Sequence, residues 1–170
     1  LGITDDFSVA FWMHAQADGG RIIQQGWDAT GNETGWTVDF GINEAWEESG
    51  SITFGAGDNS GDYDAGATVT TGENSVGEGQ WWHVAVVKDG TEVEVYLNAK
   101  LKARGTIPAE TVSFADGQTL TIGEGFTGLL DEVAVFVDRS LAKGDVELLY
   151  NSQKDPYGVG DIVFHCRTGD

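Results

Sequence analysis

The sequence predicts an all-β protein, an antiparallel two-sheet sandwich with one short helix near the C-terminus. Short segments in which apolar and polar residues alternate recur along the chain, as in half-buried strands. Glycine is abundant, with 25 residues against 2 prolines, which favours many tight turns. Only residues 140–152 place apolar residues at helical spacing. Many short strands with one helix are typical of a sandwich.

The first expected strands show this alternation clearly. In residues 6–14, DFSVAFWMH, one face carries Phe7, Val9, Phe11 and Met13, and the other carries Ser8, Ala10, Trp12 and His14. Further short strands are expected at residues 35–42, 50–57 and 67–72.

Residues 80–105, QWWHVAVVKDGTEVEVYLNAKLKARG, predict the longest hairpin. Its turn is Lys-Asp-Gly-Thr, because Asp-Gly tolerates the positive φ that tight hairpins need. Trp82 shares the inward face with two valines, whereas Trp81 and His83 lie on the opposite face. A ligand platform formed by Trp81, Trp82 and His83 is the alternative, but the alternation favours a structural role.

The C-terminal part predicts two more strands and then the helix. The strands are expected at residues 118–123 and 129–137. The helix places Val146, Leu149 and Tyr150 on one side, and Gly144 limits its length.

Composition restricts the classes of partner. The 170 residues suit one domain, and 40% hydrophobic content is enough for a core. A net charge of −19 disfavours nucleic acid and anionic lipid. No apolar run approaches the roughly 20 residues that cross a membrane, so we expect no membrane insertion. The single cysteine excludes an internal disulfide.

Four segments, in order, resemble the laminin G-like, concanavalin A-like jelly-roll superfamily, which includes pentraxins and bacterial carbohydrate-binding modules. They are FSVAFWMHAQ, RIIQQGWD, WWHVAVVKDGTEVEVYLNAKL and LTIGEGFTGLLDEVAVFVDRSLAKGDVELLYNS, spanning roughly residues 7–152. The resemblance implies the fold, whereas the function stays open because this fold hosts lectins, adhesins, spacers and enzymes.

Both ends depart from the family pattern, which sets the expected domain boundaries. Residues 1–155 form the laminin G-like domain, and residues 156–170 add a strand that resembles the family's opening strand. Three interpretations stay open: the start of a further repeat in a tandem array, a circular permutation, or exchange of the strand with a neighbouring copy through residues 160–170.

The sequence predicts no enzyme. Glucanases of the superfamily carry alternating carboxylates, Glu-x-Asp-x-x-Glu, on one strand face. Here Asp131 and Glu132 are adjacent, so a regular strand would point them to opposite faces, and residues 133–137 carry no acid.

Calcium is the expected cofactor, because acidic, glycine-bearing loops supply the six to eight oxygens that Ca²⁺ needs. The resemblance also implies an acid near the Asp-Glu-Val strand. The candidate ligands are Asp58, Asn59, Asp62, Asp64 and Asp131.

The expected partner is a glycan or polysaccharide, because aromatic rings stack on the apolar faces of sugars beside polar side chains. The candidate binding residues, in or beside loops, are Trp27, Trp36, Trp46 and Tyr63. Trp36 also fits the core.

Two functions are therefore predicted. The first is a non-catalytic, calcium-stabilised carbohydrate-binding or adhesion module, extracellular or at the cell surface, within a larger surface or secreted protein. The second is a structural, self-assembling subunit of a fibre, surface layer or phage appendage, joined by exchange of the C-terminal strand.

Overall fold

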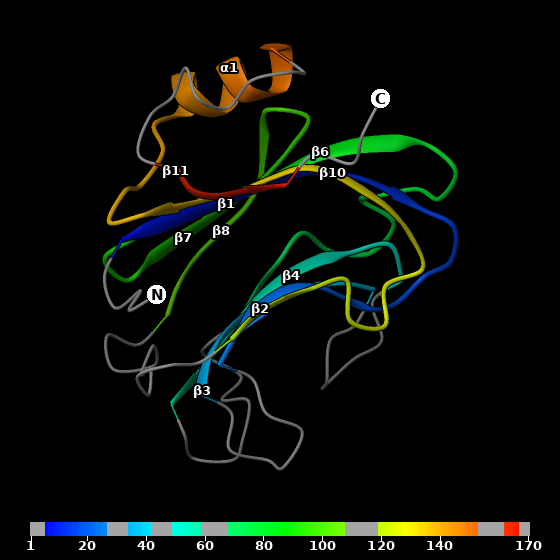
Figure 1. Cartoon of the computed structure of the whole chain (residues 1–170), viewed down its shortest axis with the longest axis horizontal. Coiled ribbons are helices and arrows are strands. Elements are labelled where there is room, and N and C mark those ends of the chain that lie inside the picture. Colours follow the sequence, from blue (N-terminus) through cyan, green and yellow to red (C-terminus); the bar gives the residue numbers. More distant parts are fainter. Residues whose placement is uncertain are drawn as a thin grey trace.

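The computed structural model describes residues 6–26, 34–41, 49–58, 68–107, 119–152 and 162–166. They form two packed antiparallel sheets, which confirms the predicted jelly-roll sandwich (Figure 1). The six-stranded sheet has the order β11-β10-β1-β6-β7-β8, and the five-stranded sheet has the order β5-β4-β3-β2-β9.

The strands lie close to the segments that alternation predicts. The six-stranded sheet contains β1 (Phe7–Ala15), β6 (Trp81–Asp89), β7 (Glu92–Leu97), β8 (Lys100–Thr106), β10 (Gly128–Val137) and β11 (Ile162–Cys166). The five-stranded sheet contains β2 (Arg21–Gln25), β3 (Thr34–Phe40), β4 (Ile52–Asp58), β5 (Thr68–Thr70) and β9 (Leu120–Ile122).

The main core lies between the two sheets, where the inward residues of β1 are buried as expected. Phe7 packs against the indole of Trp36 on β3, with ring centroids 4.9 Å apart. Trp36 is 0% exposed, so the expectation that it contacts a ligand is wrong. Its position on β3 directs the ring inward, together with Val38 and Phe40, because alternate residues of a strand share a face.

A second apolar cluster lies on the outer face of the six-stranded sheet, beneath α1 (Lys143–Ser152), which runs across that face in Figure 1. Val146 and Leu149 of the helix are buried there, as their spacing predicts. Ser8 of β1 fixes the segment before the helix, because its Oγ donates to Arg139 O and accepts from Leu141 N, both at 2.9 Å. The helix therefore covers one part of the outer face.

The C-terminal strand β11 pairs antiparallel with β10 of its own chain, at the edge of the sheet. Cys166 lies opposite Val133, and Ile162 lies opposite Phe136. The boundary at residue 155 stays a prediction, and so do the three interpretations of the last strand: a further repeat, a permuted domain and exchange with a neighbouring copy.

In the part of the chain that the structure describes, no helix is long and apolar enough to cross a membrane.

Replacing the core tryptophan tests its structural role. We expect Trp36→Ala to lower the free energy of unfolding by about 3–5 kcal/mol, because it leaves a large cavity between the sheets. Leu101→Ala, at a side chain 43% exposed on β8, is the control and should change stability by about 0.5 kcal/mol or less. Urea unfolding measures both, and wild-type stability in Trp36→Ala would contradict the burial of this ring.

Candidate functional site

The candidate site lies on the outer face of the six-stranded sheet, beyond the part that α1 covers. It is built on β1, which pairs with β10 on one side and β6 on the other. In one row across the sheet, Trp12 lies between His83 and Asp131. In the next row, His14 lies between Trp81 and Leu129. The register therefore brings aromatic and acidic residues from distant parts of the chain to one surface.

A β-bulge in β10 places both acidic residues at this surface. The register with β1 shifts between Ala10 and Trp12, and Glu132 has a φ of +51°. The backbone N–H of Glu132 donates to Oδ1 of Asp131 at 2.9 Å. The expectation that Asp131 and Glu132 point to opposite faces is wrong, because the extra residue of a bulge interrupts the alternation.

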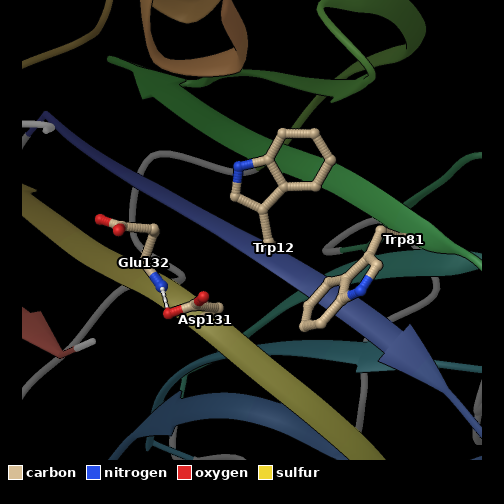
Figure 2. A pocket seen from close by; sticks show the side chains of 4 residues that line it. All are labelled: Trp12, Trp81, Asp131 and Glu132. Carbon is tan, nitrogen blue, oxygen red and sulfur yellow. Dashed lines mark hydrogen bonds between the residues drawn. The ribbon is translucent and has the colours of Figure 1, made fainter. Parts of the chain in front are cut away.

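One surface pocket of about 240 Å³ is lined by Trp12, Trp81, Asp131 and Glu132. Figure 2 shows the carboxylates of Asp131 and Glu132 on β10 and the indoles of Trp12 and Trp81 on the neighbouring strands. Trp81 is 43% exposed, so a ligand in the pocket can reach its ring. The pocket therefore offers an indole and two carboxylates to a ligand.

A second hollow of about 520 Å³ continues from the first, since Trp81 and Asp131 line both. Its other lining residues are mainly apolar: Gly123, Phe126, Gly128, Leu129 and Leu130. Leu129 is 52% exposed. The two hollows, which adjoin at Trp81 and Asp131, form one groove.

Aromatic contacts hold Trp12 in place at the end of the helix. Tyr150 of α1 stacks on its indole, with centroids 5.7 Å apart, and His83 meets it edge-on at 5.3 Å. Burial lowers the pKa of His83 from 6.5 to about 4, because a buried imidazole is poorly solvated when charged. His83 is therefore neutral near pH 7, and it supports the pocket as a packed ring rather than as a cation.

This arrangement suits recognition. Indole rings accept the flat apolar faces of sugars and also attract cations. Carboxylate oxygens accept several hydrogen bonds each, and Asp131 accepts one from the Glu132 backbone. The described lining of the first hollow contains no serine, cysteine or histidine, and so provides no nucleophile–base pair of that type.

Residues 1–147 match the sequence profile of the Laminin_G_3 family, the concanavalin A-like lectin/glucanases superfamily. The chain belongs to this superfamily. The match covers most of the chain, and it agrees with the resemblance carried by the strand motifs and with the sandwich described above. No curated protein matches the sequence.

Solved structures of this fold include binding domains of botulinum neurotoxins. The DC binding domain in complex with rat synaptotagmin II has a TM-score of 0.63 at 16% identity, covering 89% of this chain and 37% of that one. The same domain in complex with SialylT gives 0.60 at 15% identity, covering 89% and 36%. The HCR/D W1238A mutant gives 0.64 at 15%, covering 90% and 38%. This concanavalin A-like chain thus spans little more than a third of those chains, and the likeness shows the fold alone.

Most of the residues predicted to bind a ligand or calcium lie outside the described residues: Trp27, Trp46, Asn59, Asp62, Tyr63 and Asp64. Of the remaining calcium candidates, Asp58 ends β4 in the five-stranded sheet, whereas Asp131 lies on β10 in the other sheet. Within the part of the chain that the structure describes, no three His, Cys, Asp or Glu residues form a group that could hold a metal.

Sequence reasoning directed attention to loops and did not single out Trp12. It weighed Trp81 as part of a ligand platform but favoured a structural role for it. A signal for them was present, because alternation already placed both on the face opposite the core. Large aromatic residues on the outer face of a sheet indicate either a covering element or a binding surface. Here the helix contacts Trp12 through Tyr150, and Trp81 remains partly exposed.

The buried histidine makes stability depend on pH. His83 has a pKa of about 4 in the folded protein against 6.5 when exposed, so the unfolded chain binds its proton more tightly. The stability that comes from keeping this imidazole neutral is fully present above pH 6.5 and is lost as the pH falls toward 4. The variant His83→Phe keeps a ring but cannot titrate. We expect its free energy of unfolding, relative to that of the wild type, to rise by about 3 kcal/mol between neutral pH and pH 4.

Urea unfolding of both proteins across this pH range measures the difference directly. Comparing the two proteins at each pH removes the contribution of the acidic residues that they share. A difference in stability that stays constant with pH would contradict the burial of a neutral imidazole at this position.

Proposed function

We propose that this chain is a non-catalytic carbohydrate-binding module that uses the outer face of its six-stranded sheet. The observation that carries the proposal is the pocket in which a partly exposed Trp81 and the indole of Trp12 lie beside two carboxylates. Pyranose rings present an apolar face to an indole and hydroxyl groups at their edges. Carboxylate oxygens accept hydrogen bonds from such hydroxyls, so this lining offers both kinds of contact.

The position of the carboxylates supports binding rather than hydrolysis. Glycosidases usually hold two carboxyl groups on either side of the scissile bond, one as acid and one as nucleophile or base. Here the two acids are consecutive residues of one bulge, and one accepts a hydrogen bond from the backbone of the other. The pair therefore lacks the alternating Glu-x-Asp-x-x-Glu spacing with which the superfamily's glucanases place an acid and a nucleophile along one strand face.

We extend the proposal to the setting of the module. It acts outside the cell or at the cell surface, as an adhesive part of a larger surface or secreted protein, and calcium stabilises it. The calcium proposal is motivated by the acidic, glycine-bearing loops of the sequence. The binding domains of toxins that share the fold, with complexes of synaptotagmin II and SialylT, support a recognition role by analogy.

Removing the exposed ring tests glycan binding. On a glycan array, we expect Trp81→Ala to lose most binding, with affinity falling by about tenfold or more, because stacking on the ring is lost. The matched control is Leu101→Ala, since Leu101 is equally exposed, at 43%, on the same sheet, and lies on β8 away from the pocket. Absence of binding to every glycan by the wild type would overturn the proposal, and so would unchanged binding by Trp81→Ala.

A second candidate function is structural self-assembly, favoured by the edge position of β11. An edge strand pairs by backbone hydrogen bonds that a second copy of the same strand can also make. Since β11 contacts only β10 in the order of the described sheet, the neighbouring copy's β11 fits the same place. Such exchange would join copies into a fibre or layer.

The native mass of the particle in solution tests this assembly. Strand exchange predicts a large particle that becomes monomeric when residues 160–170 are deleted. An unchanged mass on deletion would exclude exchange.

The melting temperature tests the role of calcium. Calcium stabilisation predicts that a chelator lowers the melting temperature and that excess Ca²⁺ restores it, since a ligand of the folded state stabilises it. An unchanged melting temperature would exclude the calcium role.

A further inference from the structure

The pocket that carries the proposed function has a charge that selects among sugars. Its four described lining residues include two acids and no base, on a chain with a net charge of −19. We propose that the ligand is an amino sugar oligomer, whose protonated amine lies between the two indoles and the carboxylates of Asp131 and Glu132. This inference rests on the proposed glycan binding and names the class of glycan.

The lining groups act together on an ammonium group. A cation near the face of a tryptophan is attracted by the ring quadrupole, with an energy of about 0.5–2 kcal/mol. Carboxylates add charge-assisted hydrogen bonds, which are roughly twice as strong as those between neutral groups. Trp12 is already fixed by Tyr150 and His83, so little ordering is needed when the ligand binds.

Three of the described arginines form ion pairs outside the groove. Arg104 pairs with Glu94 on β7, Arg139 pairs with Asp145 at the start of the helix, and Arg21 pairs with Asp39 in the other sheet. No described basic residue lines either hollow of the groove. A sialylated or uronic sugar would therefore meet like charge in the first hollow, which is unfavourable.

The continuation of the groove favours an oligomer over a single sugar. Trp81 and Asp131 line both hollows, so a chain lying across Trp81 contacts both at once. The second hollow is mainly apolar, with Phe126, Leu129 and Leu130, and suits the face of an adjoining ring. The ammonium group then belongs in the first hollow, where both carboxylates lie.

Three β-1,4-linked hexasaccharides, which differ only at C2, test the inference. They carry an ammonium group (hexaglucosamine), an acetamido group (hexa-N-acetylglucosamine) or a hydroxyl group (cellohexaose). We measure each by isothermal titration calorimetry at mildly acidic pH, where the amine is protonated. We expect hexaglucosamine to bind about tenfold more tightly than the other two, and added salt to reduce the difference.

Two double variants distinguish the effect of the pocket carboxylates on binding from the effect of the overall negative charge. Asp131→Asn with Glu132→Gln keeps side-chain size and the oxygen that accepts from the Glu132 backbone. Glu73→Gln with Asp89→Asn makes the same change in charge, −19 + 2 = −17, at exposed positions outside the groove. We expect the first pair to abolish the preference for the amine and the second to retain it, with both melting near the wild type.

Each outcome decides one of the two proposals. Equal binding of the three oligomers, or a preference that survives in the pocket variant, would overturn the inference and leave glycan binding intact. Loss of the preference in both double variants would assign it to overall charge and also overturn it. Binding of other glycans through Trp81, but of none of these oligomers, would again overturn only the inference. No binding to any glycan would overturn the proposed function itself.

Discussion

The pairing of β1 with both β10 and β6 is the constraint on which the rest of this structure depends. One face of β1 supplies Phe7 and its inward neighbours to the core, and the other face supplies Trp12 to the surface. The two roles are inseparable, because a strand places alternate residues on opposite faces and a shift of one residue would exchange them. Burial of the inner face therefore fixes which side chains reach the candidate site.

The outer face of the six-stranded sheet is covered by α1 in one part and left partly exposed in another. Apolar residues on an outer face need cover, and α1 covers those around Ala10, Ala85 and Phe136. Near the end of the helix, Tyr150 contacts Trp12, and beyond the helix Trp81 and Leu129 remain about half exposed. Partial cover leaves a groove with a rigid floor, and rigid floors reduce the entropy cost of binding.

The bulge in β10 changes the chemistry of this groove. In a regular strand one of two consecutive acids would face the core, where an unpaired charge is costly. The left-handed conformation of Glu132 places both carboxylates at the surface instead, at a cost of order 1–3 kcal/mol for a residue other than glycine. Strain of this kind is often retained where it positions functional groups, and the adjoining indoles agree with that interpretation.

The sequence by itself determined the sandwich, the strand positions and the helix. Alternation and helical spacing are local patterns that reflect directly which side chains of a strand or helix are buried. It also placed Trp12 and Trp81 on the outer face. It could not place them next to Asp131 and Glu132, since that neighbourhood depends on the register of β1 with β6 and with β10, which lies more than 100 residues further along the chain than β1. The bulge at Glu132 was likewise decided only by tertiary packing, because it depends on how β10 pairs with β1 in the assembled sheet. For Trp36 the sequence left core and ligand contact open, and packing against Phe7 decided for the core.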